Sequence, residues 1–286
     1  MGLRCPTCRA PLDRTRACAN GHRFAEEGGV LRLLDPPFAA KLDGFLARLE
    51  EIRAAEGKRL LDPAAYPLLP FGSAHHEWRL RRYDLALARR LLRGLRPAGR
   101  PPRVLDIGAW NGWLSNRLAE DGCAVTAVDY FADPHDGLGA RQFYRAEWRA
   151  IQLDLLDLAV LEPEYDAVIL NRCLQFAPDP IAFARQARRL AAPGGLLLAT
   201  GIECFADPRA KAAAVAAEVA RYADRYAFQL FLRPTKGYLD RADLRGLAAA
   251  GLRFRPYPQL WLANLRAALR PARGRHLYGV AGAADL

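Results

Sequence analysis

The stretch VLDIGAWNGWLS, residues 104–115, limits the fold of this chain more than any other segment. An apolar run carries Asp106 near its end, and glycines follow at positions 108 and 112. Glycines at such a point permit positive φ angles and close approach of the backbone to a ligand. The layout therefore predicts a buried strand that turns sharply over a bound nucleotide into a helix.

A second acidic residue supports this prediction. Asp129 ends the apolar segment AVTAVD and lies 21 residues after Gly108. In doubly wound sheets, an acid about 20 residues beyond the glycine turn accepts hydrogen bonds from ribose hydroxyls. The G-x-G-x-x-G of dinucleotide-binding proteins is absent, because Trp110 occupies the middle position. An NAD-dependent oxidoreductase is therefore disfavoured.

Strand and helix patterns alternate over most of the chain. The predicted strands are 104–107, 124–129, 148–153, 166–171, 196–201, 252–258 and 276–282. The predicted helices are 38–60, 77–95, 113–122, 181–192, 208–232 and 243–251. The alternation predicts an α/β fold with a doubly wound, parallel, Rossmann-like sheet that helices cover on both faces.

The length of the chain, 286 residues, and its proline-containing breaks predict three parts. The break Asp35-Pro36-Pro37 separates a small module, 1–37, from a helical linker and cap, 38–100. The proline-rich stretch 96–102 then precedes the main domain, 101–286. The chain lacks an apolar run of about 18 residues and an apolar signal core. We therefore expect a cytoplasmic protein without a membrane partner.

Three cysteines and a histidine near the N-terminus have the spacing of a metal site. Cys5-Pro-Thr-Cys8 is followed by Cys18-Ala-Asn-Gly-His22. Two such pairs complete a tetrahedron and leave no open position, so the predicted zinc is structural and the module resembles a zinc ribbon. The alternatives are a disulfide, which a reducing compartment disfavours, and unrelated free thiols. The other cysteines, at 123, 173 and 204, are predicted to be ordinary buried residues.

The formal charge of +11 leaves a polyanionic partner such as RNA open. Only four of the 42 basic residues are lysines, and the arginines are spread along the chain rather than gathered in blocks. Such a bias is also typical of GC-rich genomes. Charge alone therefore does not assign a nucleic-acid partner.

Together these residues resemble the class I S-adenosylmethionine-dependent methyltransferases, whose turn after the first strand reads roughly [DE]-x-G-x-G-x-G. Asp106, Gly108 and Gly112 match that turn, and Pro193-Gly194-Gly195 matches a common turn before the fifth strand. The resemblance spans about 100–286. It implies S-adenosylmethionine as cofactor, an adenine contact from Asp154 and a place beside the transferred methyl for Asn171. The implied cofactor-binding residues are Asp106, Gly108, Ala109, Gly112, Asp129, Tyr130, Asp154, Leu155 and Asn171.

Trp110 departs from this pattern at the middle glycine. Tryptophan can replace glycine there if its φ is negative and its indole points away from the cofactor. Asn111 tolerates a left-handed conformation better than most residues. We expect the loop to bind the cofactor, with Trp110 packed over or beside the site. The alternative is a site that has lost binding.

The N-terminal module resembles that of the large-subunit rRNA guanine-N1 methyltransferases, in which a Cys-Cys-Cys-His zinc module precedes the catalytic domain and helps to grip RNA. The ligand order matches, and so does the segment Gly28-Gly29-Val30-Leu31. In contrast, the segments NRCLQFAPDP and EWRLRRYDLA resemble the methyltransferases that act on diverse, often small acceptors. The acceptor, small molecule or RNA, and the oligomeric state therefore stay unassigned.

Catalytic residues are weakly indicated. His76 and Glu77, in the segment that precedes the second helix, are candidates for a general base, and a solvated loop is the alternative. One of Arg79, Arg82 and Tyr83 is expected to meet the cofactor carboxylate. Positioning supplies most of the rate of such a transfer, so a base can be absent.

The segment after the fifth strand is predicted to form an acceptor lid. It carries aromatic residues at 222, 226, 228 and 231, most of which we expect in core packing. The leading hypothesis is a methyltransferase with a structural zinc. The competing hypothesis is a non-catalytic, zinc-containing RNA-binding protein with a degenerate methyltransferase fold, and cofactor binding distinguishes the two.

Overall fold

The computed structural model describes residues 2–59, 62–73, 75–95, 97 and 99–282. Within them, ten strands form one sheet. The strands are β1 (Glu26–Glu27), β2 (Val30–Leu33), β3 (Arg103–Ile107), β4 (Ala124–Asp129), β5 (Arg149–Leu153), β6 (Tyr165–Asn171), β7 (Ala191–Phe205), β8 (Leu239–Asp240), β9 (Arg253–Pro256) and β10 (Gly274–Gly282). Their order is β1-β2-β5-β4-β3-β6-β7-β10-β9, and β8 pairs with β7.

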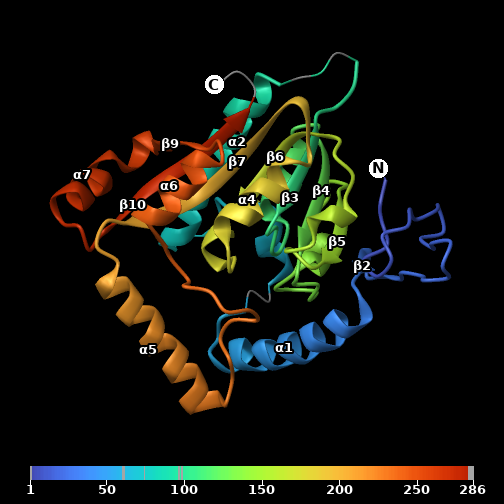
Figure 1. The fold of residues 1–286 in the computed structure, drawn as a ribbon, viewed down its shortest axis with the longest axis horizontal. Coiled ribbons are helices and arrows are strands. Elements are labelled where there is room, and N and C mark those ends of the chain that lie inside the picture. Colours follow the sequence, from blue (N-terminus) through green and yellow to red (C-terminus); the bar gives the residue numbers. More distant parts are fainter. Residues whose placement is uncertain (1, 60–61, 74, 96, 98, 283–286) are drawn as a thin grey trace.

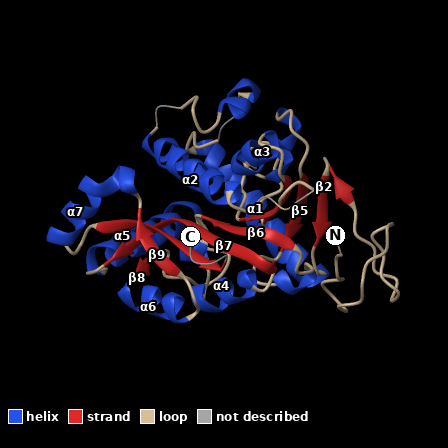
Figure 2. Ribbon diagram, turned by 90° about the horizontal axis from the view of Figure 1, so that it is seen from above, coloured by secondary structure: helices blue, strands red, loops and turns tan. Residues whose placement is uncertain are grey.

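Helices flank this sheet on both faces. The α-helices are α1 (Pro36–Ala55), α2 (His76–Arg93), α3 (Trp113–Glu120), α4 (Pro180–Arg188), α5 (Arg209–Tyr226), α6 (Arg241–Ala249) and α7 (Trp261–Leu269). The 3-10 helices are η1 (Pro63–Leu68), η2 (Leu138–Phe143), η3 (Leu158–Val160), η4 (Leu174–Phe176) and η5 (Pro258–Leu260). Figure 2 shows α2 and α3 on one face and α4 and α6 on the other. The predicted α/β fold with a doubly wound, Rossmann-like sheet is confirmed.

Each face buries its own apolar layer. Leu85 of α2 and Leu114 of α3 belong to one core cluster, and Phe183 of α4 and Leu247 of α6 belong to the other. The strands between them are apolar on both sides, as expected for a sheet that is covered twice. The sheet is thereby fixed from both faces, and its carboxyl edge is left for ligands.

The prediction of a purely parallel sheet is wrong. The strands from β2 to β7 pair in parallel, but β10 runs antiparallel to both β7 and β9. Apolar periodicity reports which residues are buried and carries no information on strand direction. The helix α7, between β9 and β10, was also missed.

Two predicted elements differ in their bounds. Pro193-Gly194-Gly195 lies inside β7 rather than before it, as an irregularity in its pairing with β6, because Tyr165 pairs with Ala191 and Ala167 with Leu196. The helix predicted over 208–232 ends at Tyr226. The predicted end of the first helix, residue 60, and positions 96 and 98 of the predicted linker lie outside the described residues.

The N-terminal segment continues the main sheet. The strand β2 pairs in parallel with β5, and Leu3 makes an isolated bridge to Leu161. The division into 1–37, 38–100 and 101–286 stays a prediction, to which the structure adds this shared sheet. Within the described ranges, none of the helices combines the length and the apolar character that crossing a bilayer demands.

Candidate functional site

The carboxyl ends of β3, β4 and β6 border a cavity of about 430 Å³. The strand β3 lies between β4 and β6, so this is the point at which the strand order reverses and at which open α/β sheets bind ligands. Its opposite wall comes from α1, α5 and the segment 230–233. Figure 1 shows both helices beneath the sheet, beyond the strand ends.

The turn after β3 requires its two glycines. The backbone N–H groups of Gly108 and Ala109 both donate to the carbonyl oxygen of Val128, at 3.0 and 3.2 Å. Gly108 has a φ of 75°, and a Cβ there would lie 2.7 Å from the Cβ of Cys173. Gly112 has a φ of 74° and no room for a Cβ against the ring of Trp148. The turn can therefore take this shape and pack against Cys173 and Trp148 only because these residues are glycine.

Trp110 takes the left-handed conformation, with a φ of 51°, so the expected negative φ is wrong. Its N–H donates to Oδ2 of Asp129 at 2.7 Å, and its indole stacks on Trp78 with ring centroids 5.8 Å apart. The guanidinium of Arg81 lies over both rings, 4.8 Å from Trp78 and 5.6 Å from Trp110. Stacking of this kind offsets a backbone strain of about 1–3 kcal/mol. Trp110 lines the cavity, as the sequence led us to expect.

Two buried carboxylates hold the turn. Asp129 accepts hydrogen bonds at both oxygens, from the N–H groups of Trp110 and Phe131, and burial raises its pKa to about 6. Asp106 is fully buried, accepts a 2.7 Å bond from Ser115 Oγ, and has its pKa raised by burial to about 7. Asp129 lines the cavity and Asp106 does not. Asp106 therefore supports the turn from behind.

The predicted cofactor residues divide between the cavity wall and the layer behind it. Gly108, Asp129, Tyr130, Leu155 and Asn171 line the cavity. The other four, Asp106, Ala109, Gly112 and Asp154, are not lining residues. Carboxylate oxygens of Asp154 accept a 3.2 Å bond from the Tyr130 hydroxyl and pair with Arg233.

The predicted candidates on α2 lie elsewhere. His76 and Glu77 are exposed and are not among the lining residues, and Glu77 pairs with Arg81 at 3.2 Å. Arg82 donates to backbone carbonyls, among them that of Phe71. The cation of this helix that does line the cavity is Arg81, which the sequence interpretation missed. The one sequence feature that could have indicated Arg81 is Trp78, which lies three residues earlier and therefore on the same face of the helix.

Arg172 is a second missed residue. It follows β6 with a φ of 56°, lines the cavity, and donates from Nε to Oδ2 of the fully buried Asp84 at 2.7 Å. The other oxygen of Asp84 accepts a 2.5 Å bond from the Tyr257 hydroxyl. A Cβ on Gly201 would lie 2.4 Å from Cγ of Arg172, so glycine makes room for this side chain. Left-handed non-glycine residues with such support cluster at functional sites.

The helical wall is largely apolar on its cavity side. Its lining residues include Leu42, Phe45, Leu46 and Leu49 of α1 and Tyr222 of α5. Tyr222 and Phe228 are buried together, which confirms core packing for two of the four predicted aromatic residues. Phe231 lines the cavity, as Tyr222 also does, and so does Cys173, which was predicted to be an ordinary buried residue.

One carboxylate joins the two helices of this wall. Glu56, at the end of α1, accepts a 2.7 Å bond from Arg221 and 3.1 Å bonds from the hydroxyls of Tyr222 and Tyr226. Lys58 lies 2.7 Å from the same carboxylate. Hydrogen bonds from Lys58 and Arg221 hold the pKa of Glu56 far below its usual range. We call these five residues the Glu56 clasp.

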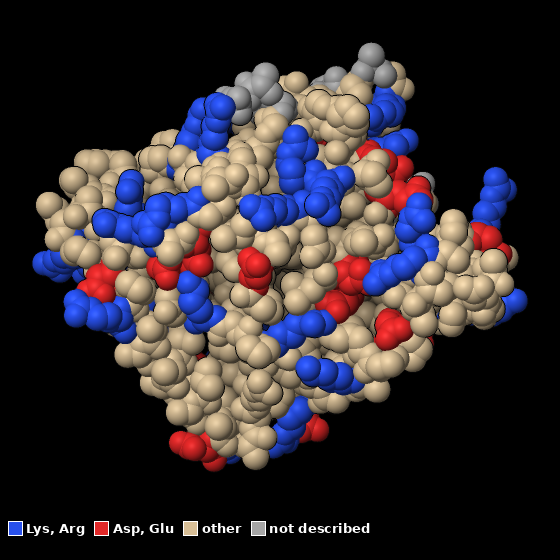
Figure 3. Space-filling model, viewed as in Figure 1, with Lys and Arg blue, Asp and Glu red and all other residues tan. Residues whose placement is uncertain are grey.

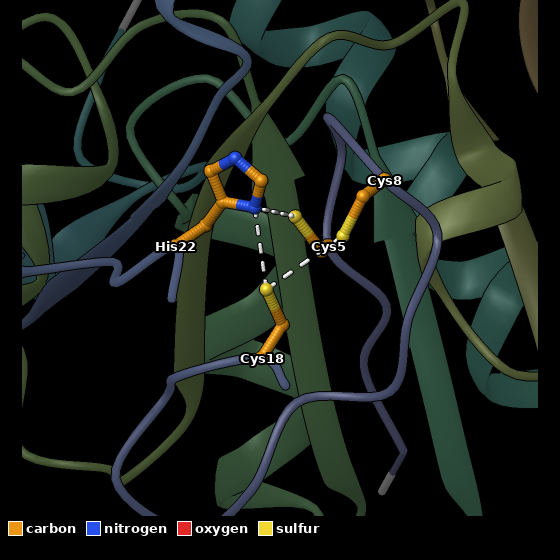
Figure 4. Close-up of side chains that lie close together, drawn as sticks. All are labelled: Cys5, Cys8, Cys18 and His22. Atoms are coloured by element: carbon orange, nitrogen blue, oxygen red, sulfur yellow. Dashed lines mark hydrogen bonds between the residues drawn. The ribbon is translucent and has the colours of Figure 1, made fainter. Parts of the chain in front are cut away.

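The predicted metal ligands come together at the opposite end of the sheet from α7. Figure 4 shows Cys5, Cys8, Cys18 and His22 turned toward one another. Their ligand atoms all lie within 4.8 Å of each other, with Cys18 Sγ 3.3 Å from His22 Nδ1 and 3.6 Å from Cys8 Sγ. A tetrahedral zinc with bonds of about 2.3 Å to sulfur has edges of roughly 3.8 Å. The donor set and its spacing fit zinc.

Known proteins are similar in sequence to part of this chain. A family model described as a methyltransferase domain matches residues 76–247. A ubiquinone biosynthesis O-methyltransferase of Xanthomonas campestris pv. campestris (strain B100) is 28% identical over 165 residues, which cover 54% of this chain and 67% of that protein. One with the same name from Xanthomonas oryzae pv. oryzae (strain PXO99A) is 30% identical over 166 residues, with the same two coverages.

Solved structures give partial matches. A phosphoethanolamine N-methyltransferase 2 of Haemonchus contortus, in complex with S-adenosyl-L-methionine, has a TM-score of 0.44 at 14% identity. The match covers 68% of this chain and 51% of that one. A magnesium protoporphyrin IX methyltransferase of Synechocystis PCC 6803 has a TM-score of 0.43 at 21% identity, covering 71% and 84%.

Proposed function

This chain belongs to the methyltransferase-domain family and is an S-adenosylmethionine-dependent methyltransferase, and we propose that its acceptor is a small molecule with an apolar body and a polar group near Arg172. The observation that carries the proposal is the cavity itself, whose far wall is built mainly from apolar side chains of α1. One tyrosine of α5 and three cations, Arg53, Lys58 and Arg233, complete that wall. A concave, mostly apolar cavity with a few convergent polar groups is the usual form of a small-molecule site.

The sheet wall fits the cofactor. S-adenosylmethionine supplies an electrophilic methyl group on a sulfonium. We propose that Asp129 accepts hydrogen bonds from its ribose hydroxyls and that Gly108 lets the backbone approach it. Tyr130 and Leu155 provide apolar contact for its base, and Arg81 offers a guanidinium to its carboxylate. Asn171, which lines the cavity, keeps its proposed place beside the transferred methyl. The other predicted cofactor-binding residues lie behind the lining, and we propose that they support it: Asp106, Ala109, Gly112 and Asp154.

We assign acceptor binding to lining residues that have no proposed contact with the cofactor. Apolar side chains of α1 would hold the acceptor body, and Arg172 would hold its polar group in a fixed direction. Alignment of the acceptor atom with the transferred methyl supplies most of the rate, and no lining side chain has to act as a base. The names of the relatives support an oxygen as that atom.

RNA remains the competing acceptor, because the N-terminal module resembles that of rRNA enzymes. Figure 3 shows Lys and Arg side chains spread over the visible face, with acidic side chains among them. A nucleic-acid groove concentrates basic residues along one path. On this face, the spread supports the small acceptor over RNA.

Label transfer tests this proposal. Purified protein is incubated with S-adenosylmethionine tritiated in its methyl group and, separately, with small-molecule extract, rRNA and tRNA. We expect label in the small-molecule fraction, and none when the Asp129→Asn variant is used. Label in RNA alone would overturn the small acceptor, and cofactor binding without transfer to any fraction would point to a degenerate enzyme.

We also propose a structural zinc on Cys5, Cys8, Cys18 and His22. The four ligands leave no coordination position for a substrate, so the metal would hold the N-terminal segment against the sheet. Metal analysis of the purified chain should find about one zinc, retained in Cys123→Ser and lost in Cys8→Ser. Equal zinc in both variants would contradict the assignment.

A further inference from the structure

The short helix α7 exposes its large apolar side chains. Trp261, Leu262, Leu265 and Leu269 are 62, 49, 52 and 77% exposed. Among the described residues, only three other large hydrophobic side chains are comparably exposed, and they are Leu68, Phe71 and Phe176. A surface helix usually turns its apolar side inward, so α7 has the opposite arrangement.

The inward side of α7 is small and polar. Asn264 and Ala267 are its buried residues. The side chain of Asn264 pairs with the backbone of His276 in β10, donating to the carbonyl oxygen at 3.0 Å and accepting from the N–H at 2.7 Å. These two bonds fix the rotation of the helix against the sheet. With 3.6 residues per turn, Trp261, Leu265 and Leu269 then form one outward stripe.

Arginines border this stripe. From Leu244 to Ala284 the sequence contains seven arginines and no acidic residue. Arg266 lies on α7 and Arg270 directly follows it, and both are exposed. An apolar stripe with tryptophan and leucine, flanked by arginines, is the pattern of a helix that lies in the plane of a membrane surface.

We propose that α7 docks this protein on an anionic lipid surface. Trp261, Leu265 and Leu269 enter the boundary between headgroups and acyl chains, and Arg266 and Arg270 contact lipid phosphates. Figures 1 and 2 both place α7 at one extremity of the molecule, so a flat surface can reach it. The proposal is independent of the acceptor and amends the expectation that no membrane is a partner.

Charge and shape distinguish lipid from the other occupants. A second copy docked face to face would bring arginines against arginines, with no acidic residue of this stretch to pair them. Nucleic acid would meet the arginines but would leave the projecting leucines without an apolar partner. A lipid surface satisfies both groups at once.

Vesicle sedimentation tests the proposal with the full chain. The probes are vesicles of phosphatidylcholine alone and of equal parts phosphatidylcholine and phosphatidylglycerol. We expect sedimentation with the anionic vesicles, little with the neutral ones, and weaker binding as salt is raised. Leu265→Ser/Leu269→Ser should lower the bound fraction at least about fivefold, because two apolar anchors are removed.

The matched control is Leu68→Ser, which removes an equally exposed leucine far from α7 in the sequence, and it should bind as the native chain does. Unchanged thermal melting of both variants excludes unfolding as the cause. Equal binding of the α7 variant and the control overturns the proposal, as does native protein that ignores anionic vesicles. A native dimer that the α7 variant converts to a monomer would assign this face to a second copy instead.

Discussion

The two walls of the cavity are built by different means. The sheet wall is a backbone structure, in which glycines at 108 and 112 and the buried carboxylate of Asp129 fix one turn. The helical wall is a side-chain structure, in which apolar residues of α1 and Tyr222 of α5 face the cavity and the Glu56 clasp joins the helices. The first wall depends on neighbours in sequence and the second on distant segments.

This difference separates what is fixed from what can move. The sheet wall belongs to the doubly covered core, so it opens only when the core opens. The helical wall packs through two much smaller apolar clusters and through ion pairs, and elements with fewer buried apolar contacts open at a lower free energy. We infer that ligands enter by movement of the helical wall, while the sheet wall stays formed.

The largest effect should come from the sheet wall. Asp129→Asn replaces an ionised acceptor with an amide, and hydrogen bonds to charged groups contribute about 1.5–3 kcal/mol each. We expect the dissociation constant for S-adenosylmethionine, measured by calorimetry, to rise roughly 100-fold. Asp121→Asn, an exposed acid at the end of α3, is the control and should change it less than about threefold. A threefold change in both variants would remove Asp129 from the cofactor site.

A smaller effect should come from Arg172, which lies between the two walls. It should change kcat/KM for the acceptor and leave cofactor affinity nearly unchanged. We expect Arg172→Lys to lower kcat/KM for the acceptor roughly 30-fold, because lysine cannot reproduce the directed contacts of a guanidinium. The charge opposite Asp84 is kept, so the fold survives, and cofactor affinity should stay within about threefold. Steady-state kinetics measure this effect with the acceptor that label transfer identifies. Arg100→Lys is the control and should keep native kcat/KM. Loss of cofactor affinity in Arg172→Lys would move this residue to the cofactor side.

The same division explains which features the sequence could predict. Asp106, Gly108 and Asp129 belong to one strand-turn-helix unit and to the next strand, so their spacing alone indicates the turn. Arg172 and Asp84 are 88 positions apart, and Glu56 and Arg221 are 165 apart. No local period encodes such pairs.

The error at Trp110 has the same origin. Local preference predicts a negative φ for tryptophan, but the stack on Trp78 and the bond to Asp129 hold the left-handed conformation. Both partners come from other elements, and together they outweigh the intrinsic preference. The antiparallel direction of β10 could not be predicted for a related reason. It depends on the end of the sheet from which the chain enters the strand after α7, and no local sequence pattern encodes that.

Lowering the pH should weaken cofactor binding at the sheet wall, by a smaller factor than the two substitutions above. Burial raises the pKa of Asp129 to about 6, so the free site is ionised at pH 7 and protonated at pH 5. Protonation removes an acceptor for the ribose hydroxyls. We expect cofactor affinity, measured by calorimetry between pH 5 and 8, to fall up to about tenfold per unit below pH 6. Asp129→Asn should show a flatter profile, and an identical slope in both proteins would contradict the assignment.

The smallest effect should come from the Glu56 clasp. Glu56→Gln keeps the shape of the side chain and removes its charge, and we expect the midpoint of thermal unfolding at pH 7 to fall by about 2–4 °C. The control is Glu51→Gln on the same helix, where an exposed pair with Arg48 contributes little. Equal shifts in the two variants would show that the clasp adds nothing specific to the helical wall.

The pH dependence of this effect has a definite sign. The pKa of Glu56 is lower in the folded chain, so its contribution is present above the unfolded value of about 4.3 and is lost as the pH falls toward the folded value. The gap between native and Glu56→Gln melting curves should therefore narrow below about pH 4.3. Cofactor affinity at pH 7 should change less than about threefold, because no residue of the sheet wall depends on the clasp. A large loss of affinity in Glu56→Gln would show instead that the two walls form one cooperative unit.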